Sequence, residues 1–132
     1  MTVRIPVQTS QKTELVDITK EIQDEVSRAG IKNGLVVVYV SHTTAAVTIN
    51  EGADPSVRED IIETLNEMVP WEKAYKHMEG NSPAHIKATL VGSSENIILE
   101  NGRLQLGRWQ HIFLCEFDGP RRRNVLVKIL PE

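Results

Sequence analysis

The chain has 132 residues, of which 40% are hydrophobic and 25% charged, and its net charge is -3. This length and composition predict one domain over residues 1–132 with its own hydrophobic core, and they argue against a disordered chain. The negative net charge offers no general attraction for nucleic acid or for an acidic membrane surface. The single cysteine, Cys115, cannot form an internal disulfide, and no signal peptide or membrane-spanning run is visible. We therefore expect a cytoplasmic protein.

The first half of the chain is predicted to contain three strands and one helix. Alternating apolar residues indicate a half-buried strand at Val3–Thr9, and Pro6 within it is tolerated at a sheet edge or a strand start. Apolar residues four apart predict a helix over Asp17–Ala29, with an aspartate able to cap its start. The continuous β-branched run Gly34–Ser41 predicts a central strand covered on both faces, and Ala45–Ile49 predicts a further short strand.

The second half is predicted to contain two helices and then four strands. Asp54-Pro55 is typical of a helix start, and the apolar stripe that follows ends near Met68. Residues 71–81 look irregular, and Ser82-Pro83 repeats the start signal for a short helix that ends near Leu90. An Asn-Gly pair then indicates a tight hairpin. The four strands are predicted at Ile97–Leu99, Leu104–Leu106, Trp109–Phe117 and Asn124–Leu130.

These elements define the predicted fold class. They amount to about seven strands and two or three helices. Successive strands joined by short connections must pair in antiparallel fashion. The sequence therefore predicts an α+β protein with an antiparallel, β-sandwich-like core and its helices on one side.

One histidine, His42, directly follows the most apolar predicted strand, in the sequence Ser41-His42-Thr43-Thr44. Polar residues at the end of a buried strand lie where folds commonly place functional sites. An imidazole there can bind a metal, transfer a proton or donate to a phosphate. The alternative is a histidine whose ring is simply satisfied by backbone groups at the strand end.

The segment that leads into the first of the two later helices carries Glu51, Asp54 and Arg58. A helix N-terminus attracts anions through its free N–H groups and its dipole. Arg58 lies one turn inside the helix and could reach the same anion or pair with Asp54, and Glu51 could ligate a metal or transfer a proton. A capped helix with a surface ion pair explains the pattern equally well.

Two further histidines, His77 and His85, lie around the start of the short helix, and their spacing fits no standard zinc motif. His85 falls in the first turn, where the helix dipole favours the neutral, metal-binding imidazole, and Lys87 is close in sequence. If the fold brought His42, His77 and His85 together with Glu51 or Glu79, they would make a zinc site with an open position.

The segment Gly102–Gln110 contains Trp109 and Gln110, which could stack on a flat heterocycle and hydrogen-bond to it. A hairpin followed by a core tryptophan is the alternative. The only dense basic run is Arg121-Arg122-Arg123, and a run that short is often a solvated turn.

Taken in order, these segments resemble the YjbQ-like family, sometimes described as secondary thiamine-phosphate synthases, over essentially the whole chain. Arg108 departs from the threonine or glutamine that usually precedes the family's tryptophan, whereas Arg122 and Arg123 match a basic pair near its last strand. The other matching pieces are His42-Thr43-Thr44-Ala45 with Asn50-Glu51, Asp54-Pro55-Ser56-Val57-Arg58, Ser82-Pro83-Ala84-His85-Ile86-Lys87, and the signature from Ser94 through Gly102 and Gly107 to Trp109-Gln110.

The resemblance implies a compact α+β fold with a β-sandwich core, usually assembled as a homotrimer. It also implies that His42, His77 and His85 share one site, often suggested to hold a divalent metal such as zinc, or magnesium that arrives with the substrate. The implied activity is weak thiamine phosphate synthase chemistry. In that reaction a pyrimidine pyrophosphate alkylates the nitrogen of a thiazole phosphate, and pyrophosphate leaves.

On this interpretation the partner is a small phosphorylated heterocycle, and the expected catalytic residues are His42, His85 and Glu51. Two alternatives stay open. One is a zinc-dependent hydrolase of a small phosphorylated substrate, in which zinc lowers the pKa of water, and the other is a non-enzymatic protein that binds a small anion. The residues expected to bind substrate are Arg58, Lys87, Trp109, Gln110, Arg122 and Arg123.

Overall fold

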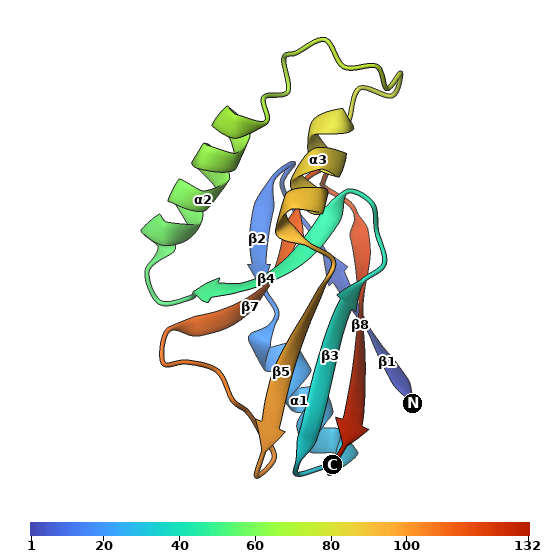
Figure 1. Cartoon of the computed structure of the whole chain (residues 1–132), viewed down its shortest axis with the longest axis vertical. Coiled ribbons are helices and arrows are strands. Elements are labelled where there is room, and N and C mark those ends of the chain that lie inside the picture. Colours follow the sequence, from blue (N-terminus) through green and yellow to red (C-terminus); the bar gives the residue numbers. More distant parts are fainter.

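The computed structural model describes residues 1–132 and contains eight strands and three helices (Figure 1). The elements of the first half are β1 (Thr2–Gln8), β2 (Glu14–Asp17), α1 (Thr19–Ala29), β3 (Gly34–Val40) and β4 (Ala45–Glu51). Those of the second half are α2 (Pro55–Met68), α3 (Ser82–Val91), β5 (Ser94–Glu100), β6 (Arg103–Leu104), β7 (Gln110–Glu116) and β8 (Arg122–Pro131). The α+β class predicted from the sequence is confirmed.

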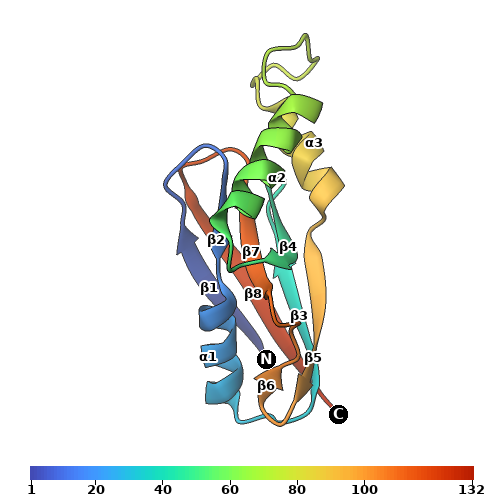
Figure 2. The same ribbon diagram turned by 90° about the vertical axis from the view of Figure 1, so that its left-hand side faces the viewer.

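Two antiparallel sheets form the core. One has five strands in the order β1-β8-β3-β5-β6, and the other has three in the order β2-β7-β4. Apolar side chains of both sheets meet between them, and Ile22 and Val26 of α1 complete this core. The helix α1 follows directly from the end of β2 (Figure 2). The helices α2 and α3 pack on the other face of the three-stranded sheet, around Phe113 and Cys115. None of the three helices has the length and apolar character needed to cross a membrane.

Local sequence signals explain several element boundaries. Pro6 lies in β1, which is an edge strand and so tolerates a missing N–H. The Asp54 carboxylate accepts a hydrogen bond of 3.0 Å from the N–H of Ser56, which caps α2 as its sequence predicts. The hairpin between β5 and β6 turns at Asn101 and Gly102, whose φ angles of 51° and 77° are left-handed.

Three features differ from the sequence-based expectations. The helices do not lie on one side, because α1 packs into the core between the sheets whereas α2 and α3 cover the other face of the three-stranded sheet. The strand β2 (Glu14–Asp17) was not predicted, and α1 begins at Thr19 because Asp17 still pairs with β7. Side chains of β3 alternate between buried and partly exposed, so the prediction that both faces of this strand are covered is wrong. Only the face that carries Val36 and Val38 lies in the core.

The uncovered face of the five-stranded sheet carries a row of apolar side chains among polar ones such as Arg122 and Lys128. Leu35 of β3 is the direct cross-strand neighbour of Leu130 on β8 and of Ile98 on β5, and Ile98 is 60% exposed. Tyr39 of β3 is also exposed. We call the outward-facing side chains of β3, β5 and β8 the outer sheet face.

Candidate functional site

A cleft of about 370 Å³ opens where β3 ends, between the β3–β4 turn and α3. His42 enters it from the turn and His85 from the first turns of α3, so the structure brings these two predicted catalytic residues to one cleft. The cleft also carries several hydroxyl groups. Its lining residues are His42, Thr43, Ala45, His85, Ala88, Thr89, Gly92 and Ser93.

His42 is held in one protonation state by the backbone of β8. Its Nε2 accepts a hydrogen bond of 2.9 Å from the N–H of Asn124, so the proton of the neutral ring is on Nδ1. Burial lowers the pKa of His42, and the positive charge of Arg123 lowers it further, whereas Glu116 acts in the opposite direction. His42 is therefore a neutral imidazole whose remaining polar atom is a donor.

Beneath His42 lies a buried ion pair between Arg123 and Glu116. The Arg123 guanidinium donates to Glu116 and also, at 2.8 Å, to the hydroxyl of Thr44. Glu116 accepts further hydrogen bonds from the Thr9 hydroxyl at 2.8 Å and from the N–H of Asp118 at 3.0 Å. Arg123, expected to bind substrate, is thus 2% exposed and hydrogen-bonded inside the protein through its Nε and Nη2, whereas Arg122 is exposed on the outer sheet face.

The third histidine, His77, lies in the loop between α2 and α3 and contacts His85. The two ring centroids are 5.4 Å apart and the rings meet edge to face at 89°. A second hollow of about 300 Å³ lies on this side of His85, lined by Tyr75, His77, Ser82, His85 and Ile86. His85 therefore forms part of the wall of both hollows.

The three histidines do not form a metal centre within one chain. No three histidine, cysteine, aspartate or glutamate side chains lie close enough to share an ion. The Nε2 of His42 is occupied by a backbone N–H, and its Nδ1 carries the ring proton. Because a metal ligand needs a free ring nitrogen, His42 as it stands in this chain does not suit the expected role.

Lys87, the cation expected beside the histidines, points away from the cleft into the protein and is completely buried. Its amine donates to the side-chain carbonyl of Asn66 on α2. Burial lowers the pKa of Lys87, and the charge of Lys12 lowers it further.

The other predicted residues lie at the opposite end of β4. Ala45 lines the cleft, and Glu51, at the end of the same strand, is roughly 20 Å away. Glu51 is paired across the sheet with Gln110, and its carboxylate accepts a hydrogen bond of 2.7 Å from the N–H of Ala53. Trp109 is 54% exposed here. Within a single chain, Glu51, Gln110 and Trp109 therefore do not share a pocket with His42 and His85.

Arg58 lies near this second group, at the start of α2. Its guanidinium carbon lies 5.4 Å from the centre of the Phe113 ring, a cation–π arrangement, and it forms no salt bridge within the chain. Trp109 has a comparable contact with Arg108, at 4.8 Å. This contact with Phe113 differs from both roles expected for Arg58, which were to bind an anion and to pair with Asp54.

The sequence also matches the family model described as "UPF0047 protein YjbQ-like" over residues 3–132. The chain belongs to this YjbQ-like family. A UPF0047 protein of Methanocaldococcus jannaschii is 51% identical over 98% of this chain and 94% of its own length. The UPF0047 protein YugU of Bacillus subtilis is 46% identical over 96% of each chain.

Solved structures of YjbQ-like proteins have the same fold. A crystal structure of an uncharacterized conserved protein from Clostridium acetobutylicum superposes with a TM-score of 0.95 at 50% identity, over 97% of this chain and 99% of that one. A YjbQ-like protein of unknown function from Sulfolobus solfataricus also gives 0.95, at 38% identity, over 100% of this chain and 97% of that one. Family membership thus supports the fold, and a function for this YjbQ-like chain has to be argued from its site.

The sequence interpretation passed over one polar pair in this YjbQ-like chain. The Nδ1 of His111 lies 2.5 Å from the carboxylate of Asp17, and this contact joins β7 to the end of β2. Gly52 fits against the ring, since a Cβ at this position would lie 2.1 Å from the Cγ of His111. The alternation of β7 could suggest which face His111 occupies, but no local signal names Asp17 as its partner.

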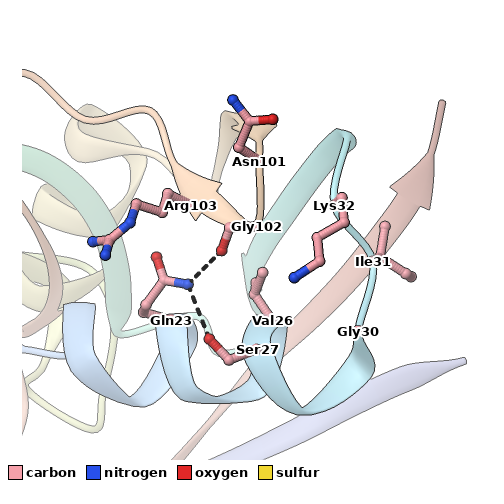
Figure 3. A pocket seen from close by; sticks show the side chains of 9 residues that line it. All are labelled: Gln23, Val26, Ser27, Gly30, Ile31, Lys32, Asn101, Gly102 and Arg103. Carbon is pink, nitrogen blue, oxygen red and sulfur yellow. Dashed lines mark hydrogen bonds between the residues drawn. The ribbon is translucent and has the colours of Figure 1, made fainter.

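A further cavity of about 310 Å³ lies between the end of α1 and the β5–β6 hairpin (Figure 3). The polar side chain at its centre, Gln23, already forms hydrogen bonds within the protein. The Gln23 amide donates at 2.9 Å to the carbonyl of Gly102 and accepts at 3.1 Å from the N–H of Leu104. The cavity therefore surrounds the hydrogen bonds that join α1 to the β5–β6 hairpin, and it is not part of the candidate site.

Proposed function

We propose that the His42–His85 cleft binds a phosphorylated heterocycle, and that the protein acts in the cytoplasm as a weak thiamine phosphate synthase-type transferase. The observation that carries this proposal is the fixed state of His42. Because the Asn124 N–H occupies Nε2, the ring presents a neutral N–H donor at Nδ1. A preorganised donor stabilises negative charge as that charge develops on a phosphate oxygen.

The proposed reaction needs few protein groups. The nitrogen of the thiazole phosphate forms a bond to the pyrimidine's methylene carbon, the bond from that carbon to the pyrophosphate oxygen breaks, and pyrophosphate leaves with the electron pair. Donors beside the leaving oxygen therefore lower the barrier. His42, His85 and the hydroxyls of Thr43 and Ser93 line one cleft and can serve in this way.

A homotrimer would supply what one chain lacks. The pyrimidine needs a stacking surface, and the exposed Trp109 offers one, with Gln110 and Glu51 beside it. These residues lie too far from His42 along β4 to act on the same small molecule. We therefore propose that a neighbouring copy contributes Trp109, Gln110 and Arg58, and that the outer sheet face mediates the assembly.

A non-enzymatic protein that binds a small anion is the second candidate. It is favoured by a site rich in hydrogen-bond donors and lined by no thiol. The zinc-dependent hydrolase requires an ion shared by three histidines, and one chain does not gather them.

The transferase proposal is tested by product formation. Purified protein is supplied with the pyrimidine pyrophosphate, the thiazole phosphate and Mg²⁺, and thiamine phosphate and pyrophosphate are quantified. We expect equal amounts of both products and a loss of roughly 10²-fold in rate for His42→Ala and His85→Ala, as for removal of one preorganised donor. The Glu21→Gln variant, which changes an exposed side chain on α1 away from both groups of site residues, is the control and should keep its rate.

Three results would decide among the candidates. Full activity in His85→Ala would contradict the transferase mechanism at this cleft. Binding of both substrates without product would favour the anion-binding protein. Stoichiometric zinc in the purified protein, together with release of inorganic phosphate from a phosphate ester, would favour the hydrolase.

A further inference from the structure

Lys87 is the most unusual buried group in the molecule. Its side chain is 0% exposed, yet no carboxylate pairs with it, and its one hydrogen-bond partner is the side-chain carbonyl of Asn66. An ammonium group has three N–H donors, and removing it from water without a counter-charge is costly. A methionine of similar length would fill the same space without that cost. The amine must therefore contribute something other than stability.

The neighbours of Lys87 come from three other parts of the chain. Asn66 lies near the end of α2, and Trp71 begins the loop that follows it. The Lys87 Nζ lies 5.8 Å from the centre of the Trp71 ring, and the Nζ of Lys12, from the β1–β2 turn, lies 3.7 Å from the same ring. Both lysines therefore contact the aromatic side chain at the base of the loop.

Lys87 is unable to reach a ligand in the cleft. It follows His85 by two residues on α3, which places the two side chains about 200° apart around the helix axis. His85 accordingly lines the cleft, while Lys87 is directed toward α2. Any effect of Lys87 on the site must act through another residue.

His77 contacts His85 and lies in a loop whose base is beside Lys87. The loop that carries it, residues 70–81, spans the ends of α2 and α3 (Figure 1), and most of its side chains from Glu72 to Gly80 are exposed. At its far end, Asn81 donates to the Asp118 carboxylate at 3.0 Å. At its near end, Trp71 packs against the apolar cluster below α2 and α3.

We infer that Lys87, Asn66 and Trp71 form a clamp that fixes the base of the 70–81 loop and so positions His77 against His85. The inference rests on the proposed function, because it makes Lys87 a positioning residue of that site. It replaces the direct substrate contact that the sequence suggests for Lys87.

The clamp is tested with Lys87→Met by following the nuclear Overhauser effect between the ring protons of His77 and His85. Wild-type protein should show this contact, and Lys87→Met should lose it while its free energy of unfolding in urea is unchanged or higher. Asn66→Asp retains an acceptor for the amine and should keep the contact. Lys73→Met makes the same substitution at an exposed lysine of the loop and should also keep it.

A retained His77–His85 contact in folded Lys87→Met would overturn the clamp. If that variant does not fold, Asn66→Ala removes the same hydrogen bond from α2, and a retained contact there overturns the clamp equally. Since this readout needs no substrate, the two proposals fail separately. Loss of the contact with transferase activity intact would support the clamp and count against a role for His77 in the proposed reaction.

Discussion

Glu116 and Arg123 show how a buried charge is tolerated in this core. Both oxygens of the Glu116 carboxylate accept more than one hydrogen bond, and Arg123 also donates to Thr44. Burial opposes ionisation of Glu116, but the hydrogen bonds from Arg123, Asp118 and Thr9 outweigh it and lower the pKa of this carboxyl below its ordinary value of 4.5. Glu116 is therefore ionised in the folded protein, and each member of the pair needs the other as a hydrogen-bond partner.

The first prediction concerns stability in acid. A carboxyl whose pKa is lower in the folded state binds protons more readily when unfolded, so its stabilising effect is complete above pH 4.5 and is lost as the pH falls through the folded pKa. Glu116→Gln should cost about 3–5 kcal/mol at pH 7, because it leaves Arg123 buried without a counter-charge. The variant should also show a weaker loss of stability below pH 4.5. Urea denaturation at a series of pH values measures both effects.

Glu21→Gln, at an exposed position on α1, is the matched control and should match wild type at every pH. If the free energy of unfolding fell equally with decreasing pH in wild type and in Glu116→Gln, another carboxyl would control the acid response of the protein.

At this scale the sequence indicates residue types better than it indicates their surroundings. His42 and His85 were recognised from polar segments at element ends, and they do share a cleft. Arg122 and Arg123 are adjacent, so strand alternation requires them to face opposite sides, but it does not reveal which one is buried. The burial of Lys87 depends on α2, which lies about twenty residues earlier in the chain, and no local pattern contains that information.

Among the elements, the end of β7 is locked to its neighbours by His111. The ring binds Asp17 of β2, fits against Gly52 after β4, and stacks near Phe113 with ring centroids 6.3 Å apart. Hydrogen bonds from His111 and Thr19 lower the pKa of Asp17 even though burial acts to raise it. The His111 imidazole, on β7, therefore contacts Asp17 at the end of β2 and Gly52 directly after β4.

The second prediction is that Gly52 is required because of this ring. Gly52→Ala should destabilise the protein by roughly 1–3 kcal/mol, since the new methyl group has to displace His111. In the double variant with His111→Ala, much of that cost should disappear. A double-mutant cycle in urea measures this coupling.

Gly107→Ala is a suitable control, because its Cβ would meet only the flexible end of Gln110, at 3.2 Å. Additive costs for Gly52→Ala and His111→Ala would mean that backbone conformation, and not the ring, requires the glycine.

Most helices and long strands could be predicted from local chemistry. The Asp54-Pro55 start of α2 and the Asn101-Gly102 hairpin are examples, because capping and left-handed backbone leave clear residue signals. The strand β2 has only four residues, and it owes its conformation to pairing with β7 almost 100 positions later. The continuous apolar run of β3 predicts burial on both faces, whereas its outward side chains have no cover in the single chain.

At the scale of the whole molecule, that uncovered face supports the proposed trimer. Leu35, Ile98 and Leu130 form an apolar row across three strands, and contiguous exposed apolar surface of this kind marks interaction sites. A second copy of the chain is the partner we propose, because the two halves of the candidate site lie at opposite ends of β4.

The third prediction is that a charge on this face dissociates the assembly. Ile98→Lys places an ammonium group in the apolar row, and removing that group from water at an interface is unfavourable. Wild type should have the mass of three chains by light scattering coupled to size-exclusion chromatography, and Ile98→Lys should have the mass of one. Leu90→Lys makes the same change at an exposed leucine of α3 and should remain trimeric.

Wild-type protein that elutes and scatters as a monomer in dilute solution would refute the trimer. It would also remove the neighbour from which Trp109 is proposed to come.

The pairing of β1 with β8 has a consequence for how the chain folds during synthesis. Thr2 lies opposite Lys128, and β8 also separates β1 from β3 in the sheet. The N-terminal strand therefore has no partner until β8 leaves the ribosome, and the apolar residues of β3 stay half-paired for the same interval. Folding dominated by such distant pairings is slow, on the order of milliseconds to seconds. Nascent chains that stop before Arg122 should accordingly remain protease-sensitive at both β1 and β3, as targets for chaperones that bind exposed strands.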